Sequence, residues 1–153
     1  MKVVINNCYG GFGLSHKAVM RYAELKGITL YPWIDDISKR VYGDKATLDN
    51  PTVLVHYTTV PQEEFDKLQT ENELKPVLPG RFDNSNAVYF WVGDIPRNDL
   101  SLIKVVTELK SEANVECSKL KIITIPDGIE WEIEEYDGAE WVAEKHRTWG
   151  GEK

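Results

Sequence analysis

The stretch Lys2–Gly27, KVVINNCYGGFGLSHKAVMRYAELKG, contains three patterns that indicate how the chain begins to fold. The β-branched run at residues 2–6 predicts a strand. Ser15 is a typical N-cap, Gly27 is a typical residue beyond a helix end, and apolar residues recur between them at helical spacing. The loop between strand and helix contains three glycines, which permit positive φ and close approach by a ligand. We therefore expect a strand, a ligand-binding loop and a helix.

The rest of the sequence predicts further strands at residues 28–33, 53–60, 87–92, 119–126 and 129–136, and helices at residues 61–74 and about 99–113. Polar residues with Gly and Pro predict loops at residues 35–52, as an insertion, and at residues 75–86. Residues 139–153 are a C-terminal arm, either a short helix or extended. Adjacent late strands pair most easily as a hairpin. We expect one α+β domain over residues 1–153, with a mixed or mostly antiparallel sheet and two to three packed helices.

Composition excludes several classes of function. A net charge of −7 without a basic stripe argues against nucleic acid as a partner. The apolar runs are far shorter than the ~20 residues of a membrane helix, so no membrane contact is expected. Cys8 and Cys117 show neither zinc nor C-x-x-C spacing, and free thiols in a reducing cytosol are expected. A small anionic ligand remains compatible with the charge.

Two segments are candidate anion sites. In the glycine loop, the spacing Gly11, Gly13, His16 breaks the dinucleotide fingerprint, and no P-loop lysine follows. What remains is a glycine loop leading into a helix N-terminus, which favours an anion; the alternative is a tight turn with Phe12 in the core. Around Arg97, a helix capped by Asn98 or Asp99 would place the guanidinium beside free amides, although the Asp99 charge opposes an anion. The alternative is that Arg97 is an ordinary surface residue with a salt bridge.

A third candidate is the C-terminal group His146, Arg147 and Trp149. Adenine stacks on tryptophan, and arginine pairs with phosphate, so the group suits a nucleotide; the alternative is an anchor for the chain end. Phe82, which follows Arg81, is a similar aromatic candidate.

Other polar groups indicate no metal, cofactor or nucleophile. Glu130, Glu132 and Glu134 alternate along one predicted strand, as a solvated outer face does. The three histidines lack metal-ligand spacing. Cys8 near a strand end is more typical of packing, although a pair with a histidine stays open.

Three motifs carry a resemblance: VINNCYGGFGLS at 4–15, IPRNDLSLIKVVTELKSEAN at 95–114 and IPDGIEWEIEEYDGAEWVAEKHRTW at 125–149. They resemble phage proteins of the first family of Thoeris anti-defence proteins. The resemblance implies a homo-oligomer in the host bacterial cytoplasm that sequesters, without cleaving, a cyclic ADP-ribose isomer made by bacterial TIR-domain proteins. No enzyme activity is then expected.

The ligand residues expected on this basis are Tyr9, Gly10, Gly11 and Phe12 as the loop wall, Arg97, Asn98 and Arg147 as polar contacts, and Phe82 as a further aromatic contact.

Two other functions stay open. His-Tyr-Thr at residues 56–58, followed by a helix, is similar to the NAD-binding start of ADP-ribosyltransferase-like enzymes. That similarity implies a ribose contact for His56 and a catalytic role for Glu132 or Glu134. A protein that binds a host protein through exposed tryptophans is the third possibility.

Overall fold

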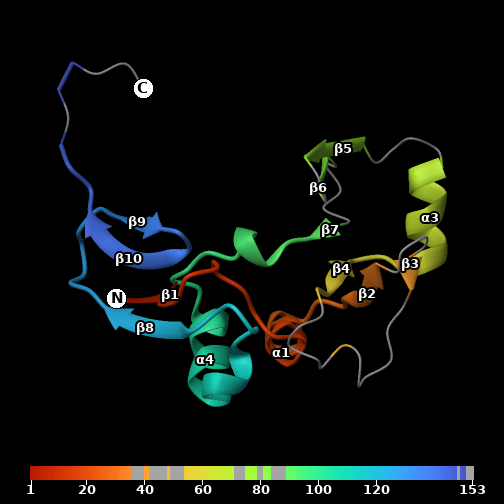
Figure 1. Ribbon diagram of the computed structural model, residues 1–153, viewed down its shortest axis with the longest axis horizontal. Coiled ribbons are helices and arrows are strands. Elements are labelled where there is room, and N and C mark those ends of the chain that lie inside the picture. The colour runs from red at the N-terminus through yellow and green to blue at the C-terminus, as the bar shows by residue number, and fades with distance from the viewer. Residues whose placement is uncertain are drawn as a thin grey trace.

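The computed structural model describes residues 1–35, 40–41, 48, 54–70, 75–78, 81–83, 89–147 and 149–150. The strands are β1 (Lys2–Asn6), β2 (Tyr31–Asp35), β3 (Arg40–Val41), β4 (His56–Thr58), β5 (Lys75–Leu78), β6 (Arg81–Asp83), β7 (Tyr89–Phe90), β8 (Leu120–Thr124), β9 (Trp131–Tyr136) and β10 (Ala139–Glu144). The helices are α1 (His16–Lys26), α3 (Gln62–Thr70) and α4 (Leu100–Leu109), with short 3₁₀ turns η1 (Val92–Asp94) and η2 (Lys110–Ala113). Figure 1 shows their arrangement.

The fold is α+β with antiparallel sheets, as the sequence predicts. In the part of the chain that the structure describes, β1 pairs with β8, β9 with β10, β5 with β6, and a larger sheet has the order β3-β2-β4-β7. All of these pairings are antiparallel. The expected single sheet is thus divided into several, and β1 pairs with β8 alone among the described strands.

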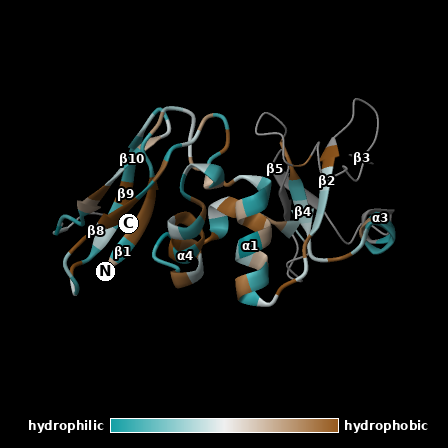
Figure 2. Ribbon diagram, turned by 90° about the horizontal axis from the view of Figure 1, so that it is seen from below, coloured by the Kyte–Doolittle hydropathy of each residue, from teal (hydrophilic) through white to brown (hydrophobic). Residues whose placement is uncertain are grey.

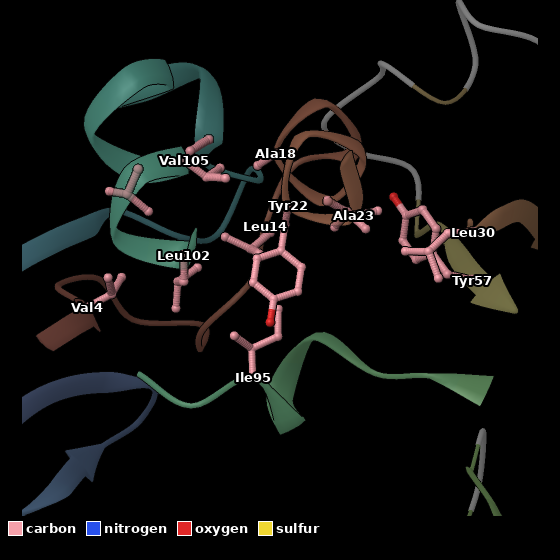
Figure 3. Packing of buried hydrophobic residues seen from close by; sticks show 13 residues of the cluster. Val4, Leu14, Ala18, Tyr22, Ala23, Leu30, Tyr57, Ile95, Leu102 and Val105 are labelled. Atoms are coloured by element: carbon pink, nitrogen blue, oxygen red, sulfur yellow. The ribbon is translucent and has the colours of Figure 1, made fainter. Parts of the chain in front are cut away.

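Helices α1 and α4 lie side by side between two groups of strands, with β1, β8, β9 and β10 on one side and β2 and β4 on the other (Figures 1 and 2). The core forms where these elements meet. Figure 3 shows the Tyr22 ring pointing from α1 toward Ile95, and Val4 of β1 beside Leu102 of α4. The cluster of buried residues comprises Val4, Leu14, Ala18, Val19, Tyr22, Ala23, Leu30, Tyr57, Ile95, Leu102, Val105, Val106 and Ala113.

Local capping explains why α1 has the predicted bounds. The Ser15 side chain accepts a hydrogen bond from the Ala18 N–H, and Gly27 has the left-handed φ of 67° that ends helices. The buried residues of α1 recur at helical spacing and belong to the same core cluster as the buried residues of α4. Helices α3 and α4 also lie within the predicted ranges, and Leu102 and Val106 of α4 are buried.

The predicted hairpin of residues 119–136 is wrong. Strand β8 pairs with β1, and β9 pairs instead with β10 across a two-residue turn. That turn is Asp137-Gly138, with φ values of 50° and 86°, and paired positive φ values are typical of the tight turn that hairpins prefer. The six residues between β8 and β9 form no such turn. Of the two forms expected for the C-terminal arm, residues 139–144 are extended, as strand β10.

Three other predictions need correction. Residues 75–86 are not all loop, because β5 and β6 pair there as an antiparallel hairpin with only two residues between them. The strand predicted at 87–92 is reduced to Tyr89–Phe90, and the chain then turns into η1. The strand predicted at 28–33 begins at Tyr31 and ends at Asp35. Most of the predicted insertion at 35–52 lies outside the described residues.

No helix in the described ranges is both long enough and apolar enough to cross a membrane.

Candidate functional site

A cavity of about 1120 Å³ lies against the glycine loop. Four segments form most of its wall: residues 10–17, residues 54–57, residues 89–93, and residues 114–118 before β8. Ligand pockets typically measure about 300–1,000 Å³ and combine apolar walls with a few polar groups. The cavity is therefore large enough for a nucleotide.

Asn6 fixes the position of the glycine loop. Its side chain is fully buried at the end of β1, and its Nδ2 donates to the carbonyl oxygens of Cys8 at 2.7 Å and Gly138 at 2.8 Å. Its Oδ1 accepts from the Lys119 N–H at 2.8 Å. One side chain thus joins the start of the loop, the β9–β10 turn and the start of β8. Sequence reasoning missed Asn6, because an Asn that ends a strand also suits an ordinary turn.

Gly10 and Gly11 are required for different reasons. Both have positive φ, 120° and 103°, and the Gly10 N–H donates to the Asp137 carbonyl oxygen at 3.1 Å. A Cβ on Gly10 would lie 2.7 Å from the Cys117 Cβ, whereas a Cβ on Gly11 would meet nothing within 4 Å. Gly10 is thus constrained by packing and conformation, and Gly11 by conformation alone.

Arg97 holds the loop in place. The centre of its guanidinium lies 3.5 Å from the centre of the Phe12 ring, which is a close cation–π contact. Its Nη1 and Nη2 donate to the two carboxylate oxygens of Glu140 at 2.7 and 2.9 Å. The side chains are only 16% and 9% exposed. Glu140 therefore occupies the donors that we expected Arg97 to offer to a phosphate.

The N-terminus of α4 is occupied by a carboxylate. Asp99, not Asn98, is the N-cap, and its Oδ1 accepts from the N–H groups of Ser101 and Leu102. Burial tends to raise the pKa of Asp99, but hydrogen bonds from Lys26 and the two amides outweigh it, and the net pKa is lowered. The residue stays ionised there, so this helix end does not suit a bound anion.

The predicted ligand residues divide into two groups. Gly10, Gly11, Phe12 and Arg97 line the cavity. Tyr9, Asn98 and Arg147 are exposed and lie outside its described wall, with the Asn98 Nδ2 near the Met1 sulfur at 3.7 Å. Phe82 pairs through its backbone with Pro76, and its side chain lies outside the described residues.

Two histidines and two tyrosines also line the cavity, and of these four the sequence suggested a ligand contact for His56 alone, as a ribose contact in the transferase alternative. Tyr57 Oη lies 2.9 Å from the Nδ1 of His16, and Tyr89 Oη lies 2.7 Å from the Nδ1 of His56. The pairing of β4 with β7 brings Tyr89 close to His56, since Tyr89 is opposite Thr58 and Phe90 is opposite Tyr57, whereas His16 comes from α1. The aromatic residues of HYT at 56–58 and YF at 89–90 are visible in the sequence. Only the structure shows that the two segments pair as neighbouring strands.

Charged groups in the wall are largely paired within the protein. Lys17 Nζ lies 3.0 Å from Glu112 Oε2, and both side chains are more than half exposed. Glu135 accepts from the Gly138 N–H, and Glu116 adds a further carboxylate. Exposed pairs contribute little stability, so Lys17 is the cation that can turn most easily toward a ligand phosphate.

Among the described residues, no group of three or more His, Cys, Asp or Glu side chains is arranged to hold a metal ion. No protein-family model, curated protein or solved structure matches this chain. The geometry of the cavity and the sequence motifs are therefore the basis for assigning a function.

Proposed function

We propose that the protein binds and sequesters a cyclic ADP-ribose-type nucleotide without cleaving it, as a phage anti-defence protein in the host bacterial cytoplasm. The observation that carries the proposal is the cavity of about 1120 Å³, in which a glycine loop, the first turn of a helix and a wall of rings meet. A nucleotide offers matching chemistry, namely phosphates for amides and a base for aromatic faces.

The start of α1 is the favoured position for the diphosphate. The first N–H groups of a helix have no partners within the helix, and they attract anions. His16 and Lys17 occupy these positions and line the cavity. In this proposal, the amides hold the phosphates, and the Lys17 ammonium leaves Glu112 to pair with them. Arg97 keeps Glu140 and Phe12 as partners and stabilises the glycine loop through these two contacts.

The claim that the ligand is held and returned intact rests on the resemblance of residues 4–15, 95–114 and 125–149 to the anti-defence family. The same resemblance supports assembly of a homo-oligomer. A subunit interface would supply a further wall for the nucleotide and reduce its exposure to solvent.

A second candidate function, transfer of ADP-ribose from NAD, is favoured by one observation. His56 lines the same cavity as Glu135 and Glu140. Glu132 and Glu134, which the sequence suggested for catalysis, are not in the described wall, and Glu134 accepts from the Trp141 indole N–H at 2.8 Å. If the protein is a transferase, Glu140 replaces them as the candidate carboxylate.

Incubation with cyclic ADP-ribose or with NAD, followed by heat denaturation and chromatography, tests the two functions. The proposal predicts recovery of unchanged cyclic nucleotide and no nicotinamide from NAD. Nicotinamide release that is lost in the His56→Ala variant would contradict sequestration and support the transferase. Cyclic nucleotide that passes through a desalting column unretained would refute the binding claim itself.

A further inference from the structure

Trp91 is an exposed tryptophan in the cavity wall. It lies between β7 and η1, and 42% of its surface is exposed. Its backbone position is fixed on both sides, because Phe90 pairs with Tyr57 in the sheet and the Trp91 carbonyl accepts the Asp94 N–H at 3.1 Å. The indole is thus presented at the cavity from a fixed point of the backbone.

Gly93 leaves the space that the indole occupies. A Cβ at this position would lie 2.5 Å from the Trp91 Nε1 and 3.0 Å from its Cδ1, so any side chain would displace the ring. Gly93 is not among the positive-φ glycines. Its conformation is therefore open to other residues, and close contact with the indole is what requires glycine there.

A preset aromatic face suits one chemical class of ligand group. Purine bases stack on tryptophan with a gain of ~1–3 kcal/mol per base, and the gain is larger when the ring needs no reordering on binding. Trp91 and the start of α1 belong to different segments of the cavity wall. The cavity can therefore separate recognition of a base from recognition of phosphates.

We propose that Trp91 is the stacking platform for the purine base of the ligand, and that the absence of a side chain at Gly93 allows the indole to take the stacking orientation. This inference rests on the proposed nucleotide binding and adds which group recognises the base. It assigns two residues that the motif resemblance leaves unassigned.

Titration of the full chain with ADP-ribose and, separately, with ribose 5-phosphate tests this inference. Trp91→Ala is expected to weaken ADP-ribose about tenfold to 100-fold, and Trp91→Phe by less than about fivefold, because phenylalanine retains a smaller stacking face. Gly93→Ala is expected to weaken ADP-ribose with Trp91 still present. Ribose 5-phosphate, which has no base, should bind all variants as it binds the wild type.

Trp141→Ala is the matched control, since that tryptophan is 44% exposed on β10 and lies outside the described cavity wall. Wild-type affinity for ADP-ribose in Trp91→Ala would overturn the platform and leave nucleotide binding intact. Equal losses for both probes would also overturn it. A wild type that binds neither ADP-ribose nor the cyclic nucleotide would refute the proposed function together with this inference. If Trp91→Ala does not fold, Trp91→Phe replaces it in the test. If Trp91 stacks on the base, the quenching of tryptophan fluorescence by the base of ADP-ribose must disappear in Trp91→Phe, because the indole is absent.

Discussion

Arg97 and Glu140 form a two-point ion pair, at 2.7 and 2.9 Å, and the same guanidinium lies over the ring of Phe12. The pair joins the segment before α4 to strand β10, and Glu140 also accepts the Asn6 N–H at 2.7 Å. Removal of one partner leaves a mostly buried charge without its counterion. The pair therefore links the glycine loop to the β9–β10 hairpin.

Arg97→Met is expected to lower the free energy of unfolding by about 3 kcal/mol, because it strands the Glu140 carboxylate. Arg97→Met combined with Glu140→Gln should recover part of this loss, since Gln still accepts from Asn6 and carries no charge. Urea unfolding measures both. Lys17→Met is the control, because it breaks an exposed pair and should leave the midpoint unchanged. An Arg97→Met variant as stable as wild type would contradict a structural role for the pair.

Alanine at Gly10, Gly11 and Gly27, three of the six glycines with positive φ among the described residues, should separate the cost of backbone strain from the cost of steric overlap. Gly11→Ala and Gly27→Ala are each expected to cost about 1 kcal/mol, since neither Cβ meets another atom. Gly10→Ala should cost more, because its Cβ overlaps Cys117. Thermal unfolding measures the order of these stability losses. An equal loss for Gly10→Ala and Gly11→Ala would contradict the close packing of Gly10 against Cys117.

Asp99 is expected to make stability depend on acid pH. Folding lowers its pKa below the ordinary 3.8, so its stabilisation is fully present above that value and is lost as the pH falls through the folded-state pKa. Asp99→Asn keeps a capping oxygen but removes the charge beside Lys26. The free energy of unfolding of the wild type should exceed that of this variant by about 0.3–1 kcal/mol at pH 7, and the difference should shrink as the pH falls below 3.8. A difference that grows as the pH falls would contradict the ion pair.

The parts of the fold that local chemistry determines could be predicted from the sequence. Ser15 and Gly27 bound α1 through their own backbone contacts. The hairpin prediction failed because the sequence contains two Asp-Gly pairs, at 127–128 and 137–138, and only tertiary packing shows which one turns a hairpin. The second turn is selected by its contacts with Asn6 and Gly10.

The candidate site was predicted only in part, for a related reason. The glycine loop has a local signature, and Gly10, Gly11 and Phe12 line the cavity as expected. The ring wall depends on the pairing of β4 with β7, two strands of three and two residues that no periodicity reveals. Arg97 was expected either to bind a phosphate or to form a salt bridge at the surface, and the sequence could not show which, because its partner Glu140 is 43 residues away.

Arg147 tests whether the active form is an oligomer. It is exposed and lies outside the described wall of the cavity in its own chain, so it can contact a ligand there only if another subunit supplies it. We expect light scattering to report at least two 17.5 kDa chains. Arg147→Ala should then weaken a cyclic ADP-ribose by ~1.5–3 kcal/mol, the value of a charge-assisted hydrogen bond. A monomer with unchanged affinity in this variant would contradict the shared site.

Calorimetric titration of the wild-type chain with a panel of cyclic ADP-ribose isomers tests the central claim most directly. A protein that sequesters a signal must hold it at signalling concentrations, so for one isomer the account predicts a Kd near ~1 nM, or about −12 kcal/mol. Lys17→Met should weaken this binding, and Trp141→Ala should leave it unchanged. No heat of binding below millimolar concentrations of any isomer would contradict the account.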